Sequence, residues 1–420
     1  MNGNPFNFGH PVKNGDFYNR KEEMSKAIEL IRNLQSFSIV GERRIGKTSF
    51  LEYILSEELL RRYGIFPENY IIVKLDMSSL VETTRDALIG EMIEKIGVST
   101  QIDTQSKSLL ENFKGCADRA FEDGKNLVIA FDEFEKIESI PDSTFFDWLR
   151  SIFQKSNVMA ITASRTTIRG IGSDKMSPLY NIFTNLFLGL FEREETEKMI
   201  SEMFSKGDEC LDDKEISFLA DLAGRNPYLV QFIGFHYYEE RRKNRTIDEN
   251  EFEDDMLYNL KDIFEGYWEH LSKKERESLF RAAGSRRFPA SILAFLNILK
   301  SDIASKELER RGFLAKEKGR RKIFSTLFEK FMTEKNEFKK FKERQKRKLV
   351  SWIFGIIGLV GFIIGIKLIT SAADKLQELD IDMGSMTEFA LDPNFVVGLC
   401  SLIFSVLSFI ISLTSKRKSK

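Results

Sequence analysis

The sequence predicts an α/β domain built on a parallel sheet, followed by smaller helical domains and a membrane-spanning end. Three observations predict the sheet. An apolar run at residues 37–40 leads into a glycine-rich loop and then into a helical pattern. Further apolar runs alternate with helical patterns up to about residue 190, and one of them ends in the acidic pair Asp132 and Glu133. Strands that alternate with helices form parallel sheets, which bind ligands at the carboxyl ends of their strands.

Composition limits the classes of function. The 420 residues include 63 Lys and Arg against 64 Asp and Glu, so the chain is not a generally basic nucleic-acid binder. The three cysteines, Cys116, Cys210 and Cys400, are far apart and lack the spacing of a metal site, which indicates a reduced, intracellular chain. The N-terminus does not have the pattern of a secretory signal. The chain is too long for one hydrophobic core, so we expect two or three domains.

The glycine-rich loop carries the strongest functional signal. It reads Gly41-Glu42-Arg43-Arg44-Ile45-Gly46-Lys47-Thr48 and matches the phosphate-loop pattern G-x-x-x-x-G-K-[ST] over its whole length. The glycines let the backbone wrap around phosphate oxygens, and the loop N–H groups and the helix N-terminus behind them attract anions. Lys47 would reach the β- and γ-phosphates, and the Thr48 hydroxyl would bind Mg²⁺. With Ser49, these residues are the predicted nucleotide ligands of a P-loop NTPase. The alternative, a glycine turn beside a surface lysine, does not explain the flanking strand and helix.

The rest of this first domain, residues 1–190, follows in chain order. Residues 1–20 are expected to be an irregular entry segment, and a helix is expected over residues 21–34. The expected strands are 70–75, 127–131, 158–164 and a short fifth strand at 186–190. The expected helices between them are 83–96, 107–121 and 143–153.

Two strand ends carry candidate catalytic groups. Asp132 would hold Mg²⁺ through water, and Glu133 stands where a carboxylate could polarise an attacking water. The strand at 158–164 ends in hydroxyl groups followed by Arg165, a cation that could sense the γ-phosphate. An ordinary acidic strand end, and a capping serine beside an exposed arginine, are the structural alternatives.

Residues 191–260 are predicted to form a small helical lid over the nucleotide, in which Gly224 ends one helix and Pro227 begins the next. Residues 261–335 show three helix patterns and a hairpin, which is the order of a winged helix-turn-helix. The expected helices are 273–283, 289–296 and 301–310, and the expected hairpin strands are 313–316 and 322–325. Basic and acidic side chains cancel on the third helix, which makes a poor grip on phosphates, whereas the hairpin tip is basic. We therefore expect a protein-packing module, with nucleic-acid binding as the alternative.

The C-terminal part, residues 349–420, is predicted to lie in a membrane. The runs at 349–369 and 395–414 are apolar and long enough to cross a bilayer. The segment 336–348 and the last residues are basic, and the loop between the runs is acidic. Basic flanks stay in the cytosol, so both termini would be cytosolic and the loop would face outward. Two buried core helices would not explain these flanks. Membrane lipids are therefore expected partners.

Three further stretches, taken with the phosphate loop, resemble the STAND family of signal-transduction NTPases. Residues 17–23, FYNRKEE, resemble the motif that precedes the phosphate loop in that family, with Arg20 at its arginine. Residues 160–165 resemble the family strand that ends in Thr and Arg. Pro227 stands at the proline of the G-x-P lid motif. The sequence departs from the family at three positions, because Asn19 and Arg225 replace glycine and Lys21 replaces glutamate.

The resemblance covers about residues 1–335 and implies an adenine-nucleotide switch with bound Mg²⁺. Such a switch is closed with ADP, opens and self-associates with ATP, and hydrolyses ATP slowly. The resemblance also implies nucleotide contacts for Arg20 and Pro227, and a sheet in which the strand of Thr162 lies between those of Lys47 and Asp132. It further suggests the cytoplasmic membrane of a prokaryote, and a trigger or sensor protein that the sequence does not name.

Two functions of different classes follow from these patterns. The favoured one is a signalling ATPase whose membrane part is the output, as in a defence or stress response. The rival is a membrane-tethered winged-helix ATPase that binds nucleic acid. The neutral third helix of the expected winged helix-turn-helix, residues 301–310, disfavours nucleic-acid binding, and the basic hairpin favours it.

Overall fold

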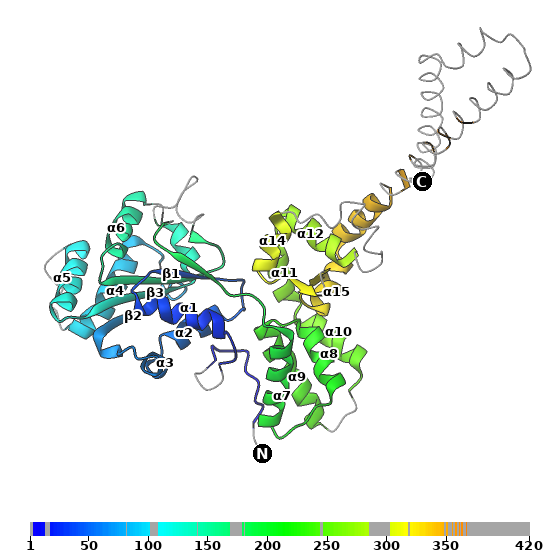
Figure 1. Ribbon diagram of the computed structural model, residues 1–420, viewed down its shortest axis with the longest axis horizontal. Helices are drawn as coiled ribbons and strands as arrows, with labels where there is room; N and C mark the ends of the chain where they lie inside the picture. Colours follow the sequence, from blue (N-terminus) through cyan, green and yellow to red (C-terminus); the bar gives the residue numbers. More distant parts are fainter. Residues whose placement is uncertain are drawn as a thin grey trace, which may run out of the picture. The chain divides into compact units, whose positions relative to one another are not determined.

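The computed structural model describes residues 3–12, 17–80, 82–100, 108–140, 142–168, 179, 181–243, 247–284, 303–317 and 320–347, with isolated positions from 350 to 367. The chain divides into two compact units, Met1–Thr333 and Glu334–Lys420. The first unit contains the predicted sheet, the lid helices and the helices and hairpin that follow them (Figure 1).

A five-stranded sheet forms the core of the N-terminal part of the first unit, among the helices α1 to α6 (Figure 1). Its strands are β1 (Phe37–Val40), β2 (Tyr70–Asp76), β3 (Asn126–Asp132), β4 (Val158–Ser164) and β5 (Thr184–Phe187). Their order is β2-β3-β4-β1-β5, and every pairing is parallel. The predicted α/β class is therefore confirmed, and so is the position of the Thr162 strand between the strands that precede Lys47 and contain Asp132.

The fifth strand begins two residues earlier than its apolar run indicated. It runs over Thr184–Phe187 rather than over residues 186–190, and among the described strands it is an edge strand that pairs with β1. Three of its four side chains are exposed, and only Leu186 is buried. A strand at the edge of a sheet can therefore begin with polar residues that an apolar pattern does not detect.

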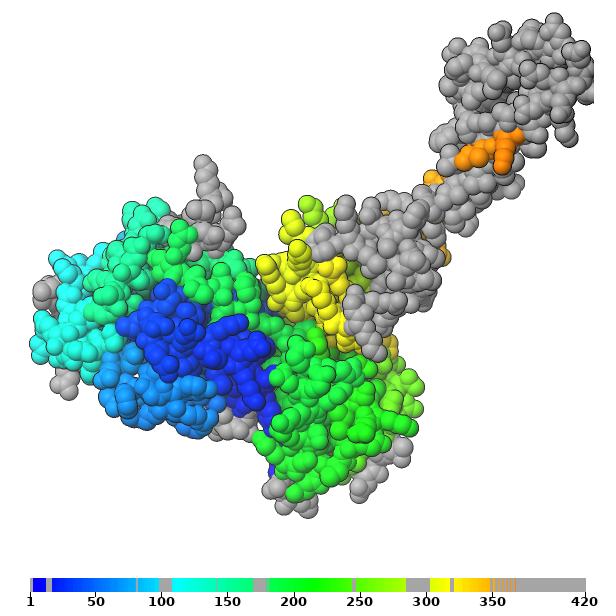
Figure 2. Space-filling model, in the orientation of Figure 1, coloured from blue at the N-terminus to red at the C-terminus, as the bar shows by residue number. Residues whose placement is uncertain are grey.

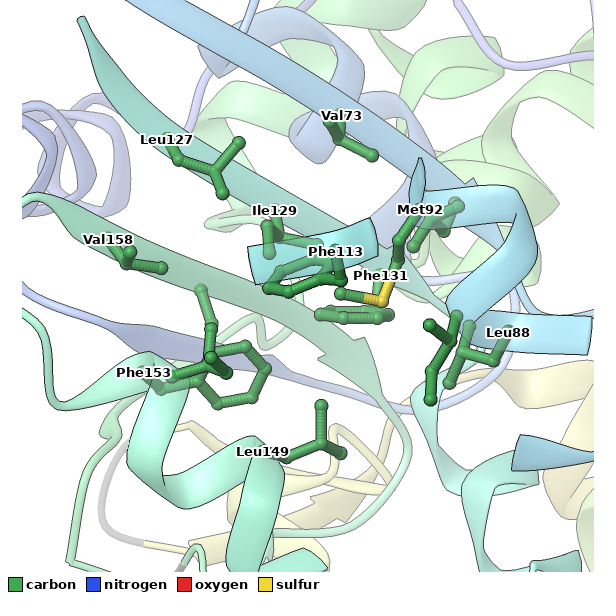
Figure 3. Close-up of a cluster of buried hydrophobic side chains, with 14 of the residues drawn as sticks. Val73, Leu88, Met92, Phe113, Leu127, Ile129, Phe131, Leu149, Phe153 and Val158 are labelled. Carbon is green, nitrogen blue, oxygen red and sulfur yellow. The ribbon is translucent and has the colours of Figure 1, made fainter. Parts of the chain in front are cut away.

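Helices cover both faces of the sheet, and alternate residues of each strand face opposite layers. One layer contains α1 (Lys21–Arg32), α2 (Lys47–Ile54), α3 (Glu57–Arg62) and the short 3-10 helix η2 (Pro67–Asn69). The other contains α4 (Arg85–Thr100), α5 (Leu109–Glu122), η3 (Phe134–Ser139) and α6 (Ser143–Phe153). In β3, Leu127, Ile129 and Phe131 pack toward α4, α5 and α6 (Figure 3), whereas Val128 and Ala130 pack toward α1 and α2. The carboxyl ends of β1, β3 and β4 meet at one edge of the sheet, because these strands are parallel neighbours.

The lid region is helical, as expected. Its helices are α7 (Arg193–Lys206), α8 (Asp213–Ala223), α9 (Pro227–Arg242) and α10 (Glu249–Asn259). Gly224 follows α8 with a left-handed φ of 60°, and the Asn226 side chain accepts hydrogen bonds from the N–H groups of Tyr228 and Leu229. Pro227 occupies the first turn of α9, where its missing N–H costs nothing.

Beyond the lid lie α11 (Lys261–Glu269), α12 (Lys273–Gly284), α14 (Ile303–Arg310), the hairpin β6 (Leu314–Glu317) and β7 (Arg320–Ile323), and α15 (Thr326–Glu334). The first and third helices expected of a winged helix, and its hairpin, are thus present. The expected middle helix, 289–296, lies outside the described residues. The paired hairpin residues extend to Glu317 and Arg320, so the turn is tighter than the five residues that the sequence indicated.

The basic segment is helical over residues 336–347. Among the residues that the structure describes, no helix is long and apolar enough to cross a membrane. The expected span 395–414 lies outside the described residues, and so does the expected span 349–369 except at isolated positions.

Candidate nucleotide-binding site

The phosphate loop joins the end of β1 to the first turn of α2, and its two glycines are needed for different reasons. A Cβ atom at Gly41 would lie 2.8 Å from Ile45 Cγ2 and 2.9 Å from the carbonyl oxygen of Leu188. Gly46 has open space around it, but its φ is +94°, which L side chains rarely adopt. Gly41 thus lets the loop pack against the chain after β5, and Gly46 lets the chain turn into α2.

Lys47, Thr48 and Asp132 lie together at the carboxyl edge of the sheet. The Thr48 hydroxyl donates to Asp132 Oδ2 at 2.6 Å, and the Glu133 N–H donates to Asp132 Oδ1 at 2.9 Å. Lys47 Nζ donates to the carbonyl oxygen of Glu42 at 3.2 Å, so its ammonium group folds back over the loop. Hydroxyl and carboxylate oxygens are ligands that Mg²⁺ prefers. Thr48 and Asp132 therefore suit a metal ion that is shared with nucleotide phosphates.

Burial changes the proton affinities of the groups at this edge. It lowers the pKa of Lys47, which is only 5% exposed. Burial raises the pKa of Asp132, although the hydrogen bond from Thr48 opposes that rise. Burial also raises the pKa of Glu133, and the neighbouring Glu135 carboxylate adds to the effect. An anion beside Lys47 would offset the cost of burying its charge, because opposite charges favour the ionised form.

Glu133 and Arg165 line different cavities. Glu133 borders the cavity at the phosphate loop, and its left-handed backbone, with φ of 51°, makes the turn from β3 into η3. Arg165 Nε donates to Glu135 Oε1 at 2.8 Å, and both residues line a second cavity of about 920 Å³. The structure therefore brings Glu133 to the phosphate loop and holds Arg165 on a carboxylate elsewhere.

The cavity at the phosphate loop has a volume of about 710 Å³, which is in the usual range for small-molecule sites. Its walls come from the phosphate loop, the N-terminal segment and the lid. The loop contributes Arg43, Arg44, Ile45, Gly46, Lys47, Thr48 and Ser49. The N-terminal segment contributes residues 7–12 with Phe17, Tyr18 and Arg20, and the lid side contributes Phe191, Met199, Pro227, Tyr228 and Gln231. Gly41 and Glu42 are the two loop residues outside this lining, and Glu42 lines the second cavity.

Arg20 is buried against the phosphate loop. Its Nη2 donates to the Ile45 carbonyl oxygen at 3.2 Å, its Nη1 donates to Glu23 Oε1 at 3.3 Å, and its guanidinium carbon lies 4.7 Å from the centre of the Phe191 ring. Burial lowers the pKa of this guanidinium. Asn19 and Arg20 both have left-handed backbones, with φ of 61° and 66°. Glycine and asparagine adopt this conformation with least strain, so asparagine is an acceptable replacement for glycine at position 19.

Sequence reasoning missed the contacts of the N-terminal segment, residues 3–12. The Val12 N–H donates to Ser49 Oγ at 3.2 Å, and the Asn7 N–H donates to Gln231 Oε1 at 2.9 Å. Phe8 packs edge-on against Phe232 of α9, and Figure 2 shows the blue N-terminal residues beside the green lid. The segment thus ties the phosphate-loop helix to the lid. Its Asn, Pro and Gly content indicated irregular chain, but no pattern in it identified a partner 224 residues away.

Two residues that follow the lid in the sequence also contact the phosphate loop, and the sequence did not indicate these contacts. The Tyr267 hydroxyl donates to the Arg43 carbonyl oxygen at 3.2 Å. Arg311 Nε and Nη2 donate to Glu42 Oε2 at 3.0 and 2.6 Å. The Arg44 guanidinium lies 4.2 Å from the centre of the Tyr228 ring of α9. The three consecutive loop residues 42–44 thus each contact a residue outside the sheet.

A parallel sheet in this strand order, with the phosphate loop at its carboxyl edge and the loop threonine bonded to a strand-end aspartate, defines a P-loop NTPase. The family model described as Novel STAND NTPase 2 (nSTAND2) matches residues 23–286, which is more than half of the chain. The chain therefore belongs to this family of STAND NTPases. No curated protein matches the sequence.

Several solved structures are similar to this chain. The Walker-type ATPase PABY2304 of Pyrococcus abyssi has a TM-score of 0.55 and 19% identity, and the match covers 78% of this chain and 99% of that chain. The ORC2 protein of Aeropyrum pernix, in ADPNP–ADP complexes, has a TM-score of 0.48 and 13% identity over 78% and 97% of the two chains. The ORC1 protein of Aeropyrum pernix, in complex with DNA, has a TM-score of 0.43 and 13% identity over 78% and 94%. At 19% identity, the likeness to the Pyrococcus ATPase shows a shared fold.

Proposed function

We propose that residues 1–335 bind ATP with Mg²⁺ and hydrolyse it slowly, as a switch. The hydrogen bond between Thr48 and Asp132 carries the proposal, because it places a hydroxyl and a carboxylate beside the phosphate-loop lysine. Thr48 and Asp132 would hold Mg²⁺, which neutralises phosphate charge when it is bound. Lys47 would leave the Glu42 carbonyl oxygen for the β- and γ-phosphates. Glu133 would orient the attacking water, and its raised pKa suits a group that accepts a proton.

The remaining cavity would hold the base and ribose between the N-terminal segment and the lid. Pro227 and Tyr228 of the lid and Phe8 of the segment supply apolar and aromatic surface, which is what a nucleobase needs. Arg20 would act from behind the loop, since it supports the Ile45 carbonyl. Family membership favours adenine. Competition between ATP and GTP for the full-length chain tests this choice.

Arg165 would sense the γ-phosphate by giving up its contact with Glu135. In the structure its guanidinium is engaged by that carboxylate, so a triphosphate would have to compete for it. Replacement by Ala should therefore weaken ATP binding more than ADP binding. Equal effects on the two affinities would remove Arg165 from this role.

Two substitutions test the chemistry of the site in the full-length chain. Lys47→Ala should abolish detectable nucleotide binding. Glu133→Gln should bind ATP normally and hydrolyse it about 100-fold more slowly or worse, because general base catalysis contributes about that much. Lys74→Ala is a matched control, since Lys74 is an exposed lysine paired with Glu52 away from the cavity. ATPase activity that survives unchanged in both test variants would exclude the proposed site.

We propose further that two spans, residues 349–369 and 395–414, anchor the protein in the cytoplasmic membrane of a prokaryote, with both termini in the cytosol. The apolar runs and the basic flanks support this, and the described part of the basic segment is helical over residues 336–347. Labelling of the acidic loop from outside the cell tests the topology. The output would be a change in the membrane, as in a defence or stress response, after ATP drives self-association. The mass of the detergent-solubilised chain with ADP and with an ATP analogue tests the self-association.

Nucleic-acid binding is less well supported as an alternative. The basic hairpin favours it, but three of the hairpin cations whose side chains the structure describes are engaged by carboxylates. Lys316 and Arg321 pair with Glu309, and Lys322 pairs with Asp221 and Glu317. Cations that are already paired release fewer counterions from a phosphate backbone. Salt-dependent binding of duplex DNA by the full-length chain would decide in favour of this alternative.

A further inference from the structure

The phosphate loop carries a buried carboxylate of its own. The Glu42 side chain is 7% exposed. Its Oε1 accepts a hydrogen bond from the Arg43 N–H at 3.1 Å, and its Oε2 accepts the two from Arg311. Arg311 directly follows α14, so it belongs to the region of α12, α14, β6 and β7, here called the C-terminal module. A residue 269 positions away in the sequence therefore neutralises the charge of a phosphate-loop residue.

The contact between the C-terminal module and the loop is supported on both sides. Arg311 Nη1 donates to Glu275 Oε1 of α12 at 2.7 Å, which orients the guanidinium toward Glu42. The side chains of Arg311 and Glu275 are 18% and 12% exposed, so water screens the three charges little. The Tyr267 hydroxyl of α11 holds the carbonyl oxygen of Arg43, the next loop residue. Two adjacent loop residues are thus fixed from the same side.

Glu42 acts on the phosphate-binding lysine in two ways. Its carbonyl oxygen accepts the hydrogen bond from Lys47 Nζ, and the negative charge of its carboxylate is felt by that ammonium group. Nucleotide phosphates would bring further negative charge to Lys47. Without a compensating cation, a buried carboxylate in the loop would repel those phosphates. Arg311 supplies that cation while the C-terminal module is docked on the loop.

We propose that Arg311 is a positioning residue for nucleotide binding, which makes the affinity of the phosphate loop depend on docking of the C-terminal module. When Arg311 is paired with Glu42, the loop binds phosphates. When that ion pair is absent, the negative charge of Glu42 repels the phosphates and weakens their binding. Because such coupling is reciprocal, bound ADP in turn holds the module on the loop. The inference rests on the proposed nucleotide site and adds to it the residue pair that joins the site to the module.

A double-mutant cycle on the full-length chain tests this charge compensation. Calorimetric titration with MgADP and MgATP is made on Arg311→Met, Glu42→Gln and the double variant. Arg311→Met should bind nucleotide about tenfold more weakly, a change of about 1.4 kcal/mol. Glu42→Gln removes the charge that Arg311 compensates, so adding Glu42→Gln to Arg311→Met should bring the affinity above that of Arg311→Met, to the level of Glu42→Gln alone. Arg321→Met is the matched control, because Arg321 is similarly buried in the same module and pairs there with Glu309.

Hydrogen exchange at residues 303–317 gives a second readout that does not need catalysis. MgADP should slow this exchange in the unmodified chain, and it should have no such effect in Glu42→Gln. Three results would overturn the proposal: unchanged or tighter binding by Arg311→Met, equally weak binding by the single and double variants, or exchange that ignores nucleotide. If the unmodified chain binds no nucleotide, the proposed function fails as well. Normal binding by the unmodified chain together with any of those three results overturns the coupling alone.

Discussion

Gly41 and Gly46 occupy the same motif, yet a side chain would be excluded from the two positions by different forces. At Gly41 the limit is steric, since Ile45 and the Leu188 carbonyl oxygen approach the position of a Cβ. At Gly46 the limit is the left-handed backbone. The phosphate-loop pattern predicts both glycines without telling these causes apart. Their consequences for folding and for binding differ and can be measured.

Gly41→Ala should lower the free energy of unfolding by about 1–3 kcal/mol, because the added methyl group overpacks a site bordered by backbone. It should also weaken nucleotide binding, since the loop must shift to make room. Urea unfolding and nucleotide titration measure the two effects. Gly90→Ala in α4 is the control, because its Cβ would meet no atom within 4 Å. That control should be neutral or stabilise by about 0.5–1 kcal/mol. Equal stability of the two variants would contradict the steric account.

At the scale of elements, the packing of the hairpin region against the lid depends on the C-terminal end of α8. A Cβ atom at Gly224 would lie 1.5 Å from the carbonyl oxygen of Phe324, just after β7. Ser325 Oγ donates to the Leu222 carbonyl oxygen at 2.6 Å, and Thr326 Oγ1 donates to that of Asp221 at 3.1 Å. The segment that leads into α15 thus satisfies two of the carbonyl groups left free at the end of α8.

Gly224→Ala should therefore cost at least about 2 kcal/mol of stability, because both the left-handed φ and the contact with Phe324 oppose a side chain. Arg225→Gly is the matched comparison at the next position. Its φ is 68°, so glycine should relieve backbone strain there by about 1 kcal/mol, less whatever the ion pair with Glu192 contributes. Thermal unfolding of both variants checks the contrast. If Gly224→Ala melts at the temperature of the unmodified chain, the close approach does not govern this join.

At the scale of the whole molecule, the proposed membrane topology follows from charge, not from packing. The segment before residue 349 and the C-terminal end are basic, whereas the loop between the apolar runs is acidic. Cytoplasmic loops retain basic residues. The nucleotide site would then face the cytosol, where ATP is available.

A cysteine introduced by Ser385→Cys should react with a membrane-impermeant maleimide added to intact cells. The unmodified chain, with its three native cysteines, is the control for background labelling. A second control places the cysteine at Ser419, near the C-terminus, which should react only after the cells are opened. Labelling of Ser385→Cys that requires lysis would reverse the topology or remove the spans.

Local patterns in the sequence were enough to predict the parallel sheet and to assign Thr48 and Asp132 to one metal site. The reason is that hydrophobic period and glycine placement act on neighbouring residues, and parallel strands bring their carboxyl ends to one edge. The same rules predicted Gly224 as a helix end and Pro227 as a helix start.

Tertiary structure alone decided which charged groups meet. The sequence offers 63 basic and 64 acidic side chains, and no local pattern pairs Arg311 with Glu42 or Arg165 with Glu135. These pairs depend on how the C-terminal module and the carboxyl edge of the sheet pack, because burial is what makes one ion pair stronger than its many exposed competitors. The place of the N-terminal segment is decided in the same way, since Val12 bonds to Ser49 while Phe8 and Asn7 of the same segment contact the lid. The chemistry of the loop is thus local, and the control of that chemistry comes from contacts between residues far apart in the chain.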